Sequence, residues 1–253
     1  MIRAAIDDRT LESVLGRASP LLKLAVAIGW LGGLILVIDG RPPLALTAVA
    51  LLAGPTLGRV SARRMLLGLL PLWGAALGIA FFNTVFATAN ANHSLAAIAE
   101  LGPWRVTRPA LDAGLALGAR ILAIASAGIL FGQTTDATRL ADSLVQQARV
   151  SPRFAYGALA AFQAVPRLME DVVALRQARR VRGLARSWHP RILVGLLVQA
   201  IRHGDRLALA MDARAFDAGP RSTFRPIRWG LADLAVAGGG VAALVLALGT
   251  TRL

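Results

Sequence analysis

The chain has 253 residues, with 28 Lys and Arg against 14 Asp and Glu, no cysteine, 56% hydrophobic residues and a mean hydropathy of +0.59. Average soluble domains are about 45–50% apolar and about 25% charged. With 17% charged residues, this composition excludes a disordered chain, and the missing cysteines exclude a disulfide scaffold and a cysteine-ligated metal site.

The net charge of +14 is unusual for so apolar a chain. A nucleic-acid partner would explain the charge but not the hydropathy. A membrane protein explains both, provided that the arginines lie in cytoplasmic loops. The lipid bilayer is therefore the expected environment, and nucleic acid is not an expected partner.

Five apolar stretches are predicted to cross the membrane as helices, which need about 20 residues to span about 30 Å of hydrocarbon. In chain order they are Leu21–Ile38, Leu44–Gly58, Met65–Thr88, Leu111–Gly132 and Trp229–Gly249. The second is short for a full span, Pro71 is expected to kink the third, and Arg120 lies in the middle of the fourth. The predicted fold class is an all-α polytopic membrane protein with about five transmembrane helices and long amphipathic cytoplasmic helices.

The loop charges predict the orientation. Arginines are denser before the first span and between the second and third spans than in the intervening loops, so the N-terminus is expected in the cytoplasm. Five crossings then place residues 133–228 inside and the C-terminus outside. The expected organisation is four membrane helices in 1–132, a cytoplasmic segment in 133–228 and the last membrane helix in 229–253, in the inner (plasma) membrane of the cell.

The cytoplasmic segment carries 16 arginines and seven acidic residues, and it is amphipathic as well as basic. Apolar residues at three- and four-residue steps predict a helix from about Pro152 to Gly183, bent by Pro166, and a second helix from Arg191 to Asp212. A shorter helix is predicted over Asp136–Ala148, with Thr135 as its N-cap. The apolar face of the first helix comprises Phe154, Ala158, Ala161, Phe162, Val165, Met169, Val172 and Val173.

Basic amphipathic helices commonly lie on an anionic leaflet, where each basic residue near the surface contributes about 1 kcal/mol of binding free energy. Both long helices, however, end in the same pattern, an arginine flanked by small or short apolar residues. Val181 and Gly183 flank Arg182, and Ala213 and Ala215 flank Arg214. Such neighbours suit a helix end that inserts into a groove of a partner, because bulky flanks would hold the guanidinium away from the groove floor.

With these residues the sequence resembles the transmembrane (T) component of energy-coupling factor transporters, which are ATP-driven importers of vitamins and metal ions. The resemblance covers most of the chain: Ser19–Lys23, Arg120, Thr134–Asp136 and the two long helices with their arginines. The family usually has glycine after the second arginine and alanine before the first. Here Ala215 replaces that glycine and Val181 replaces that alanine.

The resemblance implies a complex of two cytoplasmic ABC-type ATPases, a small substrate-binding (S) membrane protein and this chain. It implies that Arg182 and Arg214 couple the ATPases to the membrane, with Arg179 as the alternative residue in the first motif. The alternative to this coupling role is structural: both arginines merely complement the helix dipoles, each stabilising its helix by about 0.3–1 kcal/mol. The chain itself is expected to bind no cofactor, while ATP and magnesium are held by the partner ATPases. The transported substrate is not indicated.

The sequence lacks the motifs of an enzyme or a metal site. No phosphate-binding loop, nucleophile elbow or paired carboxylates are visible, so the chain is not expected to be an enzyme. His93, His189 and His203 lack the spacing of metal ligands. An arginine in the middle of a span costs about 2.5–3.5 kcal/mol to insert into the membrane, so Arg120 is expected to face the protein interior. It either anchors the bundle to the cytoplasmic helices or snorkels to a structural partner. The alternative function is a membrane scaffold whose basic helices bind anionic lipid or an acidic protein.

Overall fold

The computed structural model describes residues 8–37, 39–92, 94, 96–101, 104–183, 190–216, 219, 223 and 225–250. These residues form two compact units. Residues 8–140 and 228–250 are the bundle unit, and residues 141–227 are the helix-pair unit. Each unit is described by itself below.

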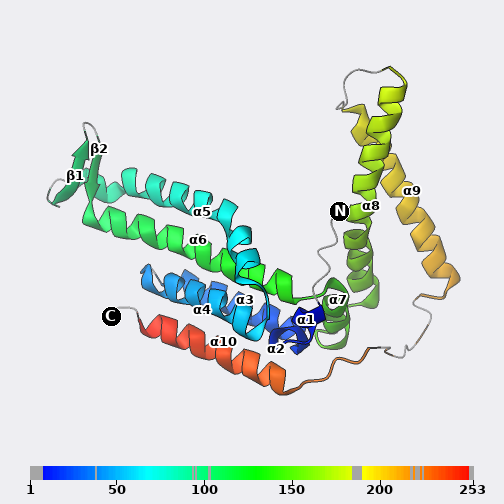
Figure 1. Cartoon of the computed structure of the whole chain (residues 1–253), viewed down its shortest axis with the longest axis horizontal. Helices are drawn as coiled ribbons and strands as arrows, with labels where there is room; N and C mark the ends of the chain where they lie inside the picture. Colours follow the sequence, from blue (N-terminus) through cyan, green and yellow to red (C-terminus); the bar gives the residue numbers. More distant parts are fainter. Residues whose placement is uncertain are drawn as a thin grey trace. The chain divides into compact units, whose positions relative to one another are not determined.

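The bundle unit consists of long apolar helices that lie side by side (Figure 1). Two short helices, α1 (Asp8–Leu11) and α2 (Val14–Arg17), precede them. The long helices are α3 (Pro20–Ile35), α4 (Arg41–Leu57), α5 (Ala62–Val85), α6 (Arg108–Thr134) and α10 (Leu231–Gly249). A 3-10 helix, η1 (Thr88–Ala91), follows α5. The last helix of the chain packs on α3 and α4, near the beginning of the sequence.

All five predicted spans are helices, which confirms the all-α membrane fold. Among the residues that the structure describes, three segments are long and apolar enough to cross a membrane: Ala62–Ala91, Arg108–Thr134 and Leu231–Gly249. Helices α3 and α4 have 16 and 17 residues, which is shorter than the roughly 20 residues of a typical span. Helix α5 continues through Pro71, and its ribbon bends in its first half (Figure 1), as a proline inside a helix predicts.

Small residues allow the membrane helices to approach closely. A Cβ added at Gly114 of α6 would lie 2.1 Å from Thr84 Oγ1 of α5, and one at Gly118 would lie 3.0 Å from the Ala76 carbonyl oxygen. Lipid supplies no hydrophobic force between helices, so such small-residue contacts provide the packing. The buried core lies between α3, α4, α6 and α10 and contains Trp30, Leu34, Leu46, Ala50, Ala123, Ala243 and Ala247.

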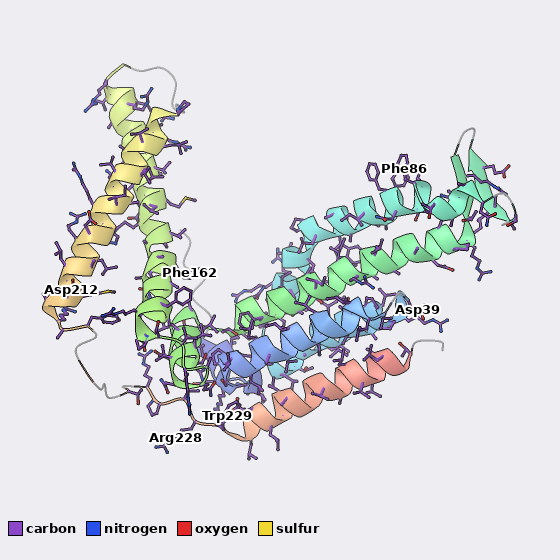
Figure 2. All side chains as sticks on the ribbon, turned by 180° about the vertical axis from the view of Figure 1, so that it is seen from behind. Asp39, Phe86, Phe162, Asp212, Arg228 and Trp229 are labelled. Atoms are coloured by element: carbon purple, nitrogen blue, oxygen red, sulfur yellow. The ribbon has the colours of Figure 1, made fainter. Side chains whose placement is uncertain are left out.

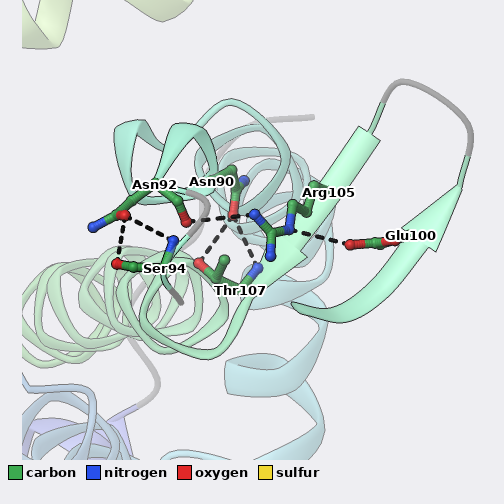
Figure 3. A network of polar contacts seen from close by, with 6 residues as sticks. All are labelled: Asn90, Asn92, Ser94, Glu100, Arg105 and Thr107. Atoms are coloured by element: carbon green, nitrogen blue, oxygen red, sulfur yellow. Dashed lines mark hydrogen bonds and ion pairs between the residues drawn. The ribbon is translucent and has the colours of Figure 1, made fainter. Parts of the chain in front are cut away.

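Between α5 and α6 the structure has a feature that the sequence analysis did not predict, an antiparallel hairpin of β1 (Ala97–Leu101) and β2 (Trp104–Thr107). A network of polar contacts holds it at the ends of these helices (Figure 3). The Asn90 side chain donates to the Thr84 carbonyl oxygen at 2.7 Å and accepts the Thr107 backbone N–H at 2.9 Å. Arg105 and Glu100 form a cross-strand ion pair at 3.2 Å. These strands have only five and four residues, at the lower limit of the length over which alternation indicates a strand, so they were not recognised in the sequence.

The helix-pair unit contains α8 (Pro152–Val181) and α9 (Arg191–Ala213), close to the predicted bounds. Helix α7 (Ala137–Gln146) begins in the bundle unit and ends in the helix-pair unit. Asp136, rather than the predicted Thr135, caps α7, because its carboxylate accepts the backbone N–H groups of Thr138 and Arg139 at 3.1 Å. Helix α8 runs uninterrupted through Pro166, so the bend at this residue stays a prediction.

Candidate functional site

The first candidate arginine is the C-cap of α8. The Arg182 backbone N–H donates to the Ala178 carbonyl oxygen at 3.3 Å, which completes the last turn. Gly183 follows with φ +72° and donates its own N–H to the Arg180 carbonyl oxygen at 3.0 Å. A left-handed glycine just after the cap is the commonest way to end a helix, because it satisfies carbonyl groups that have no partner in the helix. The glycine in this motif therefore has a conformational role.

The second candidate arginine ends α9 in the same way. Arg214 is the C-cap, and Ala215 follows it with φ +52°. The backbone N–H groups of Ala215 and Phe216 donate to the carbonyl oxygens of Asp212 and Met211, at 2.9 and 3.0 Å. A left-handed conformation costs a residue with a Cβ about 1–2 kcal/mol. The family's glycine at this position is thus explained, and Ala215 retains the backbone conformation at a conformational cost.

Both arginines are free to meet a partner. Arg182 and Arg214 are exposed, and neither guanidinium donates a hydrogen bond within the residues that the structure describes. Their flanking residues are exposed too, and Val181 reaches 89% exposure, which is unusual for a valine. Arg179, the alternative for the first motif, is half-buried, and its Nε has no acceptor in the described part of the chain.

The structure does not bring the two arginines together. Helices α8 and α9 lie antiparallel along part of their length (Figure 1). Leu175 of α8 lies 3.5 Å from a Cβ built at Gly195, and Arg167 Nη1 lies 3.5 Å from His203 Nδ1. The two arginines consequently lie at opposite ends of the 23-residue helix α9, roughly 35 Å apart at 1.5 Å per residue.

Side chains that the sequence analysis missed hold the Arg214 end in place. Tyr156, the single tyrosine of the chain, packs edge-to-face on Phe216 with ring centroids 6.3 Å apart. Its hydroxyl donates to Asp142 Oδ1 of α7 at 2.8 Å. Gln146 accepts the Ile227 N–H at 2.9 Å and donates to the Arg225 carbonyl oxygen at 3.0 Å. These partners are far apart in the sequence, with 81 positions between Gln146 and Ile227, so no local pattern indicated the contacts.

The apolar faces of α8 and α9 are largely open. Phe162 of α8, labelled in Figure 2, is 66% exposed, and neighbouring apolar residues are similarly uncovered. On α8 these residues are Phe154, Val165, Met169 and Val173; on α9 they are Leu193, Val194, Leu197 and Ile201. Contiguous exposed apolar surface of this kind marks a contact with a protein or a membrane. The predicted apolar face of α8 is therefore used only in part to pack the pair.

Arg120 has a partner inside the bundle unit. Its guanidinium donates to the backbone carbonyl oxygen of Val37, just after α3. This hydrogen bond joins α6 to the end of α3 inside the bundle unit and gives Arg120 a structural partner there, while an anchor to the cytoplasmic helices stays a prediction. Arg120 Nε is buried and has no acceptor among the described residues.

A second polar cluster of the bundle unit was not predicted. Lys23, 6% exposed, donates from Nζ to the carbonyl oxygen of Thr134, the last residue of α6, at 2.7 Å. Asp233 accepts the backbone N–H of Ser19 at 2.6 Å and that of Gly230 at 2.8 Å. These contacts join α3, α6 and α10 at one end. The Ser19–Lys23 and Thr134–Asp136 segments of the family resemblance meet here, which sequence alone did not show.

No group of three or more His, Cys, Asp or Glu that could hold a metal ion occurs in the described part of the chain. His203 contacts Arg167, while His93 and His189 lie outside the described residues.

Comparison with known proteins agrees with this architecture. Residues 12–224 match the family described as CbiQ, cobalt transport protein. An energy-coupling factor transporter transmembrane protein, EcfT, of Thermosediminibacter oceani is 28% identical over 242 residues, covering 88% of each chain. The EcfT proteins of Lactococcus lactis and Limosilactobacillus fermentum are 27% and 26% identical, each with 86% of both chains covered. A match over most of the chain, together with the membrane helices and the paired helix ends, shows that the protein belongs to the CbiQ family, the transmembrane components of energy-coupling factor transporters.

Proposed function

We propose that this chain is the coupling subunit of an ATP-driven energy-coupling factor importer for a vitamin or a transition-metal ion. In this role it links two cytoplasmic ABC-type ATPases to a small substrate-binding membrane protein. ATP and magnesium bind to the ATPases, which hydrolyse the nucleotide, and this chain is a non-catalytic subunit without a cofactor of its own.

One observation carries the proposal. Arg182 and Arg214 are exposed C-cap residues with the same local geometry, and they lie at opposite ends of α9. A separation of roughly 35 Å suits two separate grooves better than one shared site. A guanidinium can bind a groove carboxylate through two parallel hydrogen bonds, and the small flanking residues let the helix end approach.

The open apolar faces of α8 and α9 support a contact with the substrate-binding membrane protein. Exposed side chains such as Phe162 and Leu197, each above 60% exposure, would be costly to leave in water. An apolar membrane partner would cover them, whereas the polar remainder of each helix stays solvated.

The membrane orientation is part of the proposal. The arginine distribution supports a cytoplasmic N-terminus, cytoplasmic residues 133–228 and an outside C-terminus. The native chain has no cysteine, so single cysteines give a clean test. In intact cells an impermeant thiol reagent is expected to label Ser94→Cys, in the loop after η1, and to leave Gln177→Cys, on α8, unlabelled. The reverse pattern would refute the orientation.

The coupling role is tested by alanine variants of the two arginines, measured by co-purification of both ATPases and by substrate uptake. Each single variant is expected to keep the ATPases partly bound and to lose most uptake, because truncating a desolvated charged contact costs about 2–5 kcal/mol at an interface. The double variant is expected to lose the ATPases. Lysine at either position is expected to rescue poorly, since it lacks the two-pronged geometry.

Arg180→Ala is the matched control, because Arg180 is an exposed arginine in the last turn of α8 and contributes equally to the helix dipole. It is expected to behave like the parent protein. Full uptake by the double variant, or an equal loss of uptake in Arg180→Ala, would show that both arginines only complement the helix dipoles. Binding to anionic vesicles with no ATPase capture by the parent chain would favour the membrane-scaffold alternative.

A further inference from the structure

The bundle unit contains a cavity of about 310 Å³ between α3, α4, α6 and α10. This volume lies at the lower end of the range of small-molecule pockets. Its walls are almost entirely apolar, with Trp30, Val49, Phe131 and Gly239 among the lining residues. Lys23 is the one ionisable side chain among the described residues that line the cavity.

The polarity of the cavity changes along its length. Its polar end lies where the helices end: Lys23 is in the first turn of α3, Leu57 is the last residue of α4, and Thr134 is the last residue of α6. From Lys23 the cavity extends along α3 to Trp30, which is about 10 Å at 1.5 Å per residue. One leaflet provides about 15 Å of hydrocarbon. The cavity therefore covers about two thirds of the depth of one leaflet, and it has the polarity gradient of a lipid.

The charge at the polar end favours an anion. The Lys23 ammonium has three donors, and the Thr134 carbonyl oxygen is the hydrogen-bond acceptor that the described residues give it. The carboxylate of Asp233 also acts on Lys23 electrostatically, but its oxygens accept the backbone N–H groups of Ser19 and Gly230. At the same end the Arg139 guanidinium donates to the carbonyl oxygens of Gly16 and Arg17, which adds positive charge.

From these observations we propose that the cavity binds one acyl chain of an anionic phospholipid, with its phosphate at Lys23. The acyl chain of the lipid lies against Trp30 and α10, and the remaining Lys23 donors bind the phosphate oxygens. This site is independent of the ATPase contacts and adds a structural lipid to the bundle.

The experiment uses the full chain in nanodiscs that contain either phosphatidylglycerol or phosphatidylcholine with brominated acyl chains. Bromine quenches tryptophan fluorescence on contact, and a Trp30→Phe variant identifies the Trp30 contribution. At equal mole fraction, brominated phosphatidylglycerol is expected to quench Trp30 with about fivefold higher apparent affinity than brominated phosphatidylcholine, the ratio that corresponds to about 1 kcal/mol per basic residue. Lys23→Met is expected to abolish this preference.

Two adjacent glycines provide a variant that leaves the polar contacts intact. A Cβ at Gly239 or at Gly238 meets nothing within 4 Å, but only Gly239 lines the cavity. Gly239→Leu should fill the cavity and reduce Trp30 quenching severalfold, while Gly238→Leu should quench like the parent protein. Equal quenching by the two lipids would indicate ordinary annular lipid and overturn the proposal. Equal behaviour of the two leucine variants would overturn it as well.

Discussion

The residues that follow Arg182 and Arg214, the two arginines proposed to contact the ATPases, offer a reciprocal test of the helix-end geometry. Ala215 is left-handed at φ +52°, whereas Gly183 occupies the equivalent position at φ +72°. Left-handed geometry costs alanine about 1–2 kcal/mol, and glycine loses about 0.5–1 kcal/mol more than alanine in backbone entropy on folding. The net effect of Ala215→Gly is therefore about 0.5–1 kcal/mol of stabilisation of the α9 end, and Gly183→Ala should destabilise the α8 end by a similar amount. No heavy atom lies within 4 Å of the added Cβ at Gly183, so its backbone conformation alone sets that effect.

Native-state hydrogen exchange measures this local stability directly. In Ala215→Gly, the amide of Phe216, which donates to the Met211 carbonyl oxygen, should exchange roughly two- to fivefold more slowly, the ratio that corresponds to about 0.5–1 kcal/mol. In Gly183→Ala, the amide of residue 183 should exchange faster by a similar factor. Both variants retain their arginine, so ATPase capture should persist in each.

Ala213→Gly is the control, because Ala213 is the last helical residue of α9 and has helical geometry. At this helical position the substitution of alanine by glycine should accelerate exchange of the Phe216 amide, since glycine in a helix costs about 1 kcal/mol relative to alanine. If Ala215→Gly and Ala213→Gly shift the Phe216 amide in the same direction, the left-handed assignment of Ala215, and with it the explanation of the family's glycine, is wrong.

Three further predictions concern the bundle unit and are measured by thermal unfolding of the purified chain, with uptake as a second readout for the last. Gly114→Ala should lower stability by about 1–3 kcal/mol, because its Cβ collides with α5. Gly128→Ala, on the open face of the same helix, should raise stability by up to about 1 kcal/mol, because alanine is the better helix former and its Cβ meets nothing within 4 Å; an equal effect of both would refute close α5–α6 packing. Asp233→Ala should cost about 3 kcal/mol, since it leaves two backbone N–H groups without their carboxylate, and Asp233→Asn should cost less; a neutral alanine variant would contradict this polar contact. Arg120→Leu should insert and unfold like the parent protein, because the lost Val37 contact is offset by the removed insertion cost, yet take up less substrate; wild-type uptake would reduce Arg120 to a tolerated polar residue.

The sequence alone was sufficient for the fold class and for the location of the helices. Apolar runs and 3.6-residue periodicity are local signals, and they identified the five long apolar helices of the bundle unit and both long amphipathic helices. The paired arginine motifs were recognisable because each is contained in a few consecutive residues. The hairpin between α5 and α6 was missed, since Asn90 stabilises it through contacts with Thr84 and Thr107 rather than through strand periodicity.

The tertiary structure decided the features that depend on distant residues. Lys23 and Thr134 are 111 positions apart, and Ser19 and Asp233 are 214 apart, so neither pairing leaves a periodic trace in the chain. The tertiary structure likewise determines which carbonyl oxygen Arg120 binds and that Tyr156 packs on Phe216. The conformational reason for the family's usual glycine at the position of Ala215 also required the structure, because a sequence gives the side chain but not the sign of φ. Secondary structure follows from neighbouring residues, whereas buried polar partners are chosen by packing.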